Sequence, residues 1–118
     1  QNRYCIENRA ADMTMNVYLA FSMTLAAAVE GIKMKIHPGK PTDQDLYEMT
    51  DKEFKKLGIK RLPRNLLMAL EALKNDKLSD EVIGTVMKKS LLAYKNDEWE
   101  RYHQAVTDWE VKEYLRLY

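Results

Sequence analysis

Glu7 and Arg9 are two side chains whose types and spacing could support chemistry on a charged substrate. A carboxylate can ligate a divalent metal ion, and the planar guanidinium of arginine can bind a carboxylate or a phosphate at two points. If the chain is extended here, side chains two residues apart project from the same face. The spacing alone nevertheless favours a surface ion pair, because local charge identifies functional sites only statistically.

The element that must position this pair is predicted to be a strand from Arg3 to Arg9. The segment is short, alternates roughly in character and carries no helix stop signal. Nothing else in the chain reads as a partner strand, and a lone strand cannot pair its backbone groups. We therefore expect its sheet to lie upstream of this sequence. The first residue, Gln1 in place of Met, is in keeping with a fragment or a processed N-terminus.

The chain is predicted to be mainly α, with one N-terminal strand and its loop over residues 1–15 and helices over residues 16–118. Asn16 is a suitable N-cap for a helix from Val17 to about Glu30, with Gly31 ending it in the left-handed conformation. This helix is apolar on nearly every side, so it should be buried on all faces. The rest of the chain is too short to wrap it, which again implies a larger body.

Four further helices are expected from their capping residues. In chain order the signals are Thr50 with Glu53 for a helix near Lys52 to Leu57 ended by Gly58, Pro63 in the first turn of a helix to about Lys74, Ser79 capping a helix from Asp80 to about Val106, and Thr107 with Glu110 for a last helix to Tyr118. The stretch from Ile36 to Pro41 is expected to be an ordered turn.

The bulk composition bounds the possible functions. A chain of 118 residues with 46% hydrophobic and 31% charged residues is an ordinary single globular domain. Its formal net charge of +1 gives no general reason to expect nucleic acid or an acidic membrane as a partner. The longest apolar run, Val17 to Val29, is too short for a typical transmembrane helix. Cys5 is the lone cysteine, which excludes an internal disulfide and favours the cytoplasm.

Several short motifs resemble the glutamine synthetase family, in the same order and at similar spacing along nearly the whole chain. They are IENRAAD from Ile6, NVYLAF from Asn16, KIHPG from Lys35, LPRNLL from Leu62 and EWERYH from Glu98. The last of these, with the residues after it, resembles the GlnT-type branch that includes γ-glutamylmethylamide synthetases. The resemblance implies that the chain is the C-terminal part of an α+β catalytic domain of this type.

The resemblance also implies an activity. Such enzymes are ATP-dependent carboxylate–amine ligases that use Mg²⁺ or Mn²⁺ and form glutamine or a γ-glutamyl amide from glutamate and ammonia or a small amine, through a γ-glutamyl phosphate. Full-length relatives are expected to form homo-oligomers, here through the helical part. Most of the catalytic residues of the family lie in motifs that this sequence lacks, so we expect the isolated chain to be inactive.

By the same resemblance, Glu7 occupies the position of a metal ligand. Arg9 occupies the position of a catalytic, substrate-binding arginine that contacts the carboxylate of glutamate and the transferring phosphate. Cys5 stands where the family has a nucleotide-binding arginine, and Arg3 is a candidate substitute for it on the same face. Cys5 itself is expected to be a small packed residue rather than a nucleophile.

Other residues receive simpler interpretations. Asp12 is expected to fix the loop before Asn16, His37 to form a turn, and His103 to pack on its helix. A hypothesis of another class is a stand-alone, non-catalytic helical interaction module derived from such a ligase. Nucleic-acid binding through the basic region from Lys55 to Arg64 is a third possibility, but the chain lacks the excess of positive charge that it requires.

Overall fold

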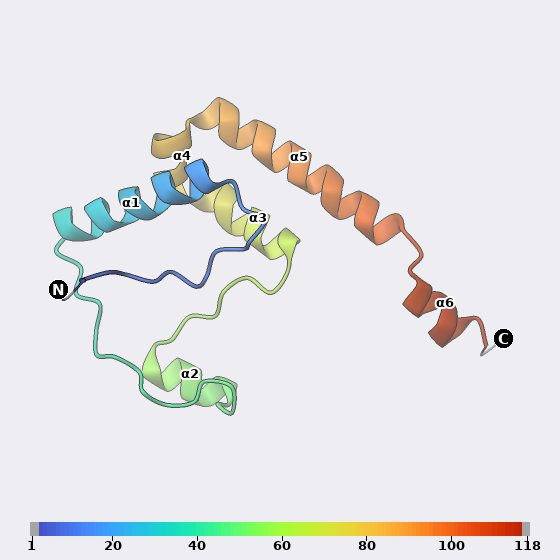
Figure 1. Ribbon diagram of the computed structural model, residues 1–118, viewed down its shortest axis with the longest axis horizontal. Coiled ribbons are helices and arrows are strands. Elements are labelled where there is room, and N and C mark those ends of the chain that lie inside the picture. The colour runs from blue at the N-terminus through green and yellow to red at the C-terminus, as the bar shows by residue number, and fades with distance from the viewer. Residues whose placement is uncertain (1–2, 117–118) are drawn as a thin grey trace. The chain divides into compact units, whose positions relative to one another are not determined.

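The computed structural model describes residues 3–116, and within them the chain forms six α-helices (Figure 1). The helices are α1 (Val17–Lys33), α2 (Asp51–Leu57), α3 (Leu66–Asn75), α4 (Lys77–Ile83), α5 (Thr85–Gln104) and α6 (Asp108–Tyr114). The chain divides into two compact units, Gln1–Leu62 and Pro63–Tyr118. The mainly helical class predicted from the sequence is confirmed.

The strand predicted over Arg3–Arg9 is not found. Residues 3–8 are irregular, Arg9 lies in a turn, and no strand occurs anywhere in residues 3–116. The physical reason is the lack of a partner strand within the described residues, as the sequence pattern already indicated. A strand is defined by hydrogen bonds to a neighbouring strand, and the described chain offers no second strand to provide them.

Helix α1 begins where the sequence predicts and ends later. The Oδ1 atom of Asn16 accepts a hydrogen bond from the backbone N–H of Leu19 at 3.2 Å, which confirms the N-cap. Gly31 does not end the helix, because a glycine permits the left-handed conformation without requiring it. The left-handed residue is instead Lys35, at φ 53°. The backbone N–H of Ile36 reaches back to the carbonyl of Gly31 at 2.9 Å and closes the helix end.

No residue of α1 is buried. Tyr18 is 84% exposed and Ile32 is 77% exposed, and Phe21 and Leu25 are exposed as well. The sequence predicts a helix buried on every face, and the described residues do not provide that cover. The apolar surface of α1 is therefore exposed among the described residues.

In the second unit, α3 begins at Leu66, three residues after the proline that was expected inside its first turn. The Oδ1 atom of Asn65 accepts a hydrogen bond from the backbone N–H of Met68 at 2.9 Å and acts as the N-cap. Pro63 thus precedes the helix and does not occupy its first turn. Helix α3 packs on α5, and its Leu70, 5% exposed, is the one buried hydrophobic residue among those that the structure describes.

The single helix predicted from Asp80 to Val106 is two helices. Gly84 separates α4 from α5 with φ 77° and ψ 152°, far from helical values. Ser79 is not the cap: the carboxylate of Asp76 accepts its backbone N–H at 2.7 Å, which makes Asp76 the N-cap of α4. Ser79 is instead fully buried in the first turn, with its hydroxyl donating to the carbonyl of Asp76 at 2.8 Å.

Both predicted capping boxes are present. The backbone N–H of Thr50 donates to Glu53 at 2.7 Å, and the backbone N–H of Thr107 donates to Glu110 at 2.8 Å. Gly58 ends α2 in the left-handed conformation at φ 68°, as predicted. Helix α6 ends at Tyr114, and the predicted end at Tyr118 lies outside the described residues.

The exposed area of the chain is larger than compact folding would leave. The accessible surface is 11589 Å². Two separate compact domains of about 7 kDa each would together expose about 8,000 Å². The excess does not depend on how the two units are placed, so the chain carries surface that a compact protein of this size would bury.

The end of α1 gives a first testable prediction. Left-handed backbone costs a non-glycine residue about 1–2 kcal/mol, so the substitution Lys35→Gly should relieve strain and raise the helicity of a peptide spanning residues 14–40. Circular dichroism measures this directly. Lys33→Gly is the matched control, because it places the same glycine inside the helix and should lower helicity. Equal losses in both variants would contradict the assigned helix end.

The capping boxes give a second prediction. Hydrogen bonds from the backbone and the side chain of Thr107 lower the pKa of Glu110 below its ordinary value of 4.5. A carboxyl with a lowered folded pKa stabilises the fold above its unfolded pKa, and this contribution disappears as the pH falls through the folded value. The start of α6 should therefore fray only as the pH falls through the lowered pKa of Glu110. The NMR resonance of the Thr107 amide should report this transition. The pH-dependent change should be absent in the variant Glu110→Gln and present in the control Glu113→Gln.

Candidate functional site

The structure brings Glu7 and Arg9 together. The Nε atom of Arg9 donates to one carboxylate oxygen of Glu7 at 2.8 Å, and Nη2 donates to the other at 3.3 Å. Both side chains are exposed, Arg9 by 84% and Glu7 by 70%. The pairing agrees with the shared face expected from their spacing, and it takes the form of the surface ion pair that the spacing alone favours. Roles in metal or substrate binding stay a prediction.

The energy of this pair decides what it can do. An exposed ion pair contributes about 0–1 kcal/mol to stability, because water solvates both partners well when they separate. A metal ion on the carboxylate, or a carboxylate or phosphate on the guanidinium, can replace that contact at little cost. The pair therefore contributes little to the stability of the fold and leaves both groups available to ligands.

The loop after the pair is fixed by three short polar side chains. Asn8 accepts the backbone N–H of Ala10 at 3.0 Å, and Asp12 accepts that of Thr14 at 2.7 Å. Together with the cap at Asn16, they fix the turns between the pair and α1. Asp12 thus has the loop-fixing role expected for it. Asn8 was not singled out from the sequence, although its place one residue before Arg9 is typical of such a turn.

Arg3 and Cys5 precede the pair, and both are exposed. The expectation that Cys5 is packed is wrong for this chain, because no described element covers the segment around it. The structure brings neither residue into a described polar contact with Glu7 or Arg9. The candidate role of Arg3 in nucleotide binding therefore rests on its sequence position alone.

Glu7 fits one position of a metal site and cannot form the site by itself. Residues 3–116 contain no group of three His, Cys, Asp or Glu side chains placed to hold a metal ion. Mg²⁺ is usually bound through one or two carboxylates together with phosphate oxygens and water, so a single exposed carboxylate matches one of its ligands.

The remaining candidates have structural roles. The Nδ1 atom of His37 accepts the backbone N–H of Gly39 at 3.0 Å, as expected for a turn. The ring of His103 lies 3.8 Å from that of Trp99, centre to centre, on α5. Arg61 bonds Asp51 at 2.9 Å and covers the ring of Phe54. None of the helices in residues 3–116 is long and apolar enough to cross a membrane.

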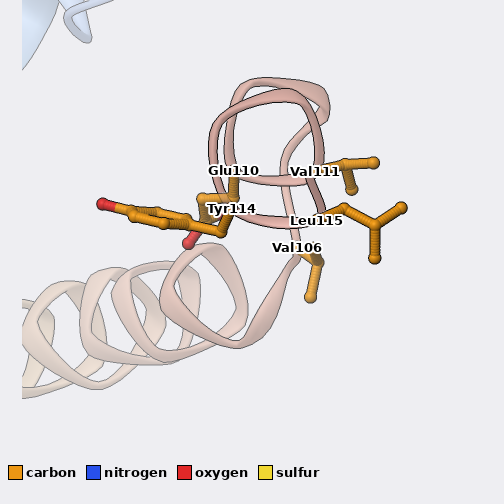
Figure 2. Close-up of a pocket in the computed structure, with 5 residues that line it drawn as sticks. All are labelled: Val106, Glu110, Val111, Tyr114 and Leu115. Carbon is orange, nitrogen blue, oxygen red and sulfur yellow. The ribbon is translucent and has the colours of Figure 1, made fainter. Parts of the chain in front are cut away.

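An apolar hollow of about 480 Å³ lies along α6 (Figure 2). It is lined by Val106, Glu110, Val111, Tyr114 and Leu115. The carboxylate of Glu110 is already engaged by Thr107, so the hollow offers little to orient a polar substrate. The rest of its lining is mostly apolar.

Comparison with known proteins decides the family. Residues 1–114 match the protein family described as "Glutamine synthetase, catalytic domain". The chain belongs to this glutamine synthetase family. Glu7, Arg9 and the loop to Asn16 all lie inside the matched range, which confirms the resemblance drawn from the short motifs.

Curated relatives agree with this assignment. The chain is 38% identical over 112 residues to the glutamine synthetase of Methanococcus maripaludis, with 95% of this chain and 25% of the relative covered. It is 40% identical over 110 residues to that of Methanocaldococcus jannaschii, covering 93% and 24%. It is 37% identical over 113 residues to the glutamate–methylamine ligase of Methyloversatilis universalis, covering 96% and 25%. This glutamine synthetase segment thus spans about a quarter of the length of its relatives.

Proposed function

We propose that this chain is the C-terminal part of an ATP-dependent ligase that joins the γ-carboxylate of glutamate to ammonia or a small amine through a γ-glutamyl phosphate. The observation that carries the proposal is the family match over residues 1–114, a range that includes Glu7 and Arg9. The product is glutamine or a γ-glutamyl amide. The enzyme is expected to act in the cytoplasm as a homo-oligomer assembled through its helical part.

Arg9 is proposed to bind the anionic oxygens of the substrate and of the transferring phosphoryl group. A planar guanidinium suits this role because it can pair with two oxygens at once, as it does with Glu7 at 2.8 and 3.3 Å. Phosphoryl transfer depends mainly on positioning and on neutralising charge, so a fixed cation of this shape would act directly on the reacting group.

Glu7 is proposed to be one ligand of a Mg²⁺ or Mn²⁺ ion, which when bound would neutralise charge on the phosphates of ATP. For Glu7 and Arg9 to take these roles, their ion pair must open. Opening leaves neither charge unpaired, because the metal ion replaces Arg9 as the partner of Glu7 and the substrate replaces Glu7 as the partner of Arg9. Arg3 is proposed to contact the nucleotide in place of the arginine that Cys5 replaces.

The acceptor amine is left open between ammonia and a small amine. The two glutamine synthetases described above and the glutamate–methylamine ligase have nearly equal identity to this chain, between 37% and 40%. A stand-alone helical module is less well supported, because one buried hydrophobic residue, Leu70, is a small core for an independent fold. Nucleic-acid binding is disfavoured by the net charge of +1.

The third prediction concerns the full gene product that contains this chain. Glu7→Gln and Arg9→Lys should each lower kcat for γ-glutamyl hydroxamate formation by about 100-fold or more. Glutamine removes the negative charge that would bind the metal ion, and lysine keeps the positive charge but cannot pair with two oxygens at once. Glu48→Gln and Arg64→Lys are matched controls at exposed positions outside the site and should retain activity. Unchanged kcat in both site variants would remove Glu7 and Arg9 from the catalytic machinery.

The fourth prediction concerns the isolated chain of 118 residues. Incubated with glutamate, hydroxylamine, ATP and Mg²⁺ or Mn²⁺, it should form no γ-glutamyl hydroxamate, because one carboxylate and two arginines cannot assemble the whole site. An immunoblot of the source cells should detect a product about four times longer than this chain, in line with its relatives. Measurable turnover by the isolated chain, or a cellular product of 13.8 kDa, would contradict the proposal.

A further inference from the structure

The break between α4 and α5 at Gly84 is not what the local sequence favours. The pattern from Asp80 onward predicts one continuous helix, and glycine can adopt helical as well as left-handed backbone. At φ 77° and ψ 152°, Gly84 occupies a region that essentially only glycine populates. No heavy atom lies within 4 Å of where a Cβ would be, so packing at this position does not impose the break.

The break also leaves helical hydrogen bonds unmade. The first bond inside α5 runs from the backbone N–H of Lys88 to the carbonyl of Gly84 at 3.0 Å. The N–H groups of Thr85 to Met87 come before it, and Gly84 has no side chain with which to cap them. In a continuous helix those groups would bond to carbonyls of α4. Some other interaction must therefore favour the broken form.

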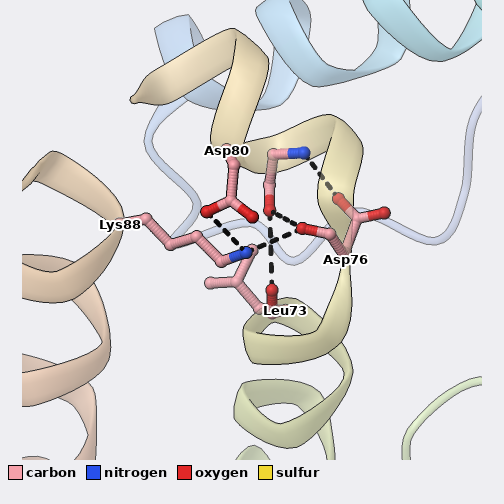
Figure 3. A network of polar contacts seen from close by, with 5 residues as sticks. Leu73, Asp76, Asp80 and Lys88 are labelled. Atoms are coloured by element: carbon pink, nitrogen blue, oxygen red, sulfur yellow. Dashed lines mark hydrogen bonds and ion pairs between the residues drawn. The ribbon is translucent and has the colours of Figure 1, made fainter. Parts of the chain in front are cut away.

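Lys88 provides that interaction (Figure 3). Its ammonium donates to the backbone carbonyl of Asp76 at 2.7 Å and pairs with the carboxylate of Asp80 at 3.0 Å. The Lys88 side chain is 5% exposed, so its ammonium is largely shielded from water, whereas the side chain of Asp80 is 42% exposed. The same carbonyl of Asp76 accepts the buried hydroxyl of Ser79, which ties the turn between α3 and α4 to α5 at one point.

These contacts and a continuous helix exclude each other. Asp80 and Lys88 are eight residues apart, and in one straight helix they would be separated by about 12 Å along the axis. Asp76 would lie farther still. The side chain of Lys88 cannot span such distances, so the contacts form only when the chain turns back at Gly84.

We propose that the Lys88 ammonium is a latch that holds α4 and α5 as two helices, and that releasing it joins them into one. The latch thereby sets the direction of α5 and the place of the hollow on α6. Its carboxylate partner, Asp80, is 42% exposed, so a cation that competes for Asp80 would loosen it from the solvent side. This conformational device is independent of the proposed ligase activity.

The test is hydrogen exchange with mass spectrometry on the full gene product. In Lys88→Met, the amides of Thr85 to Met87 should exchange at least 10-fold more slowly than in the unmodified protein, because they gain helical partners in α4. The control is Lys89→Met, the same change at the exposed neighbouring residue, which should leave these amides unchanged. The proposal would be overturned if the amides of Thr85 to Met87 exchanged as fast as in the unmodified protein while the rest of α5 stayed protected from exchange.

A second pair of variants covers the case in which Lys88→Met unfolds the corner and exchange accelerates from α3 to α5. Asp80→Asn keeps the bond from Lys88 to the carbonyl of Asp76 and removes only the charged partner. It should slow exchange at Thr85 to Met87 several-fold. Gly84→Ala, which disfavours the broken backbone without a clash, should do the same. Unchanged exchange in both variants would show that the latch does not select the broken form.

Discussion

Burial of apolar surface is the constraint on which the rest of this structure depends. Helix α1 is apolar on nearly every side and buries none of its residues, while the packed corner of α3, α4 and α5 buries a single hydrophobic residue, Leu70. Burying such side chains is the main favourable term in folding. A segment that spans about a quarter of its relatives' length is thus held in shape mostly by local hydrogen bonds and caps.

The features that could be predicted from the sequence are those that depend on local hydrogen bonds and caps. The caps at Asn16, Thr50 and Thr107 and the stop at Gly58 were predicted correctly, because each depends on residues within one turn of helix. The errors lie where a distant contact competes with a local preference. Lys88, twelve residues from the carbonyl of Asp76, outweighs the continuous helix that the local pattern favours. The strand predicted over Arg3–Arg9 is not found for a related reason, since residues 3–116 contain no second strand to pair with it.

In the candidate site, too, local features could be predicted from the sequence and features that depend on distant contacts could not. Period-two spacing was enough to expect Glu7 and Arg9 on one face, and the turn at Asp12 could be expected from its side-chain type. The exposure of Cys5 could not be predicted from the sequence, because it depends on what covers the segment around it. The roles of a metal ligand and a substrate-binding arginine came from the family motif, since an exposed pair looks the same whether or not a ligand replaces it.

The ion pair has a thermodynamic consequence for the proposed roles. While the pair is closed, Arg9 is the counter-ion of Glu7, and Glu7 is the counter-ion of Arg9. Binding a metal ion to the carboxylate frees the guanidinium, and binding an anion to the guanidinium frees the carboxylate. Each ligand therefore removes a cost that the other would have had to meet, and by linkage the benefit is equal in both directions. Two adjacent side chains suffice to make metal and substrate binding cooperative, with no movement of the helices.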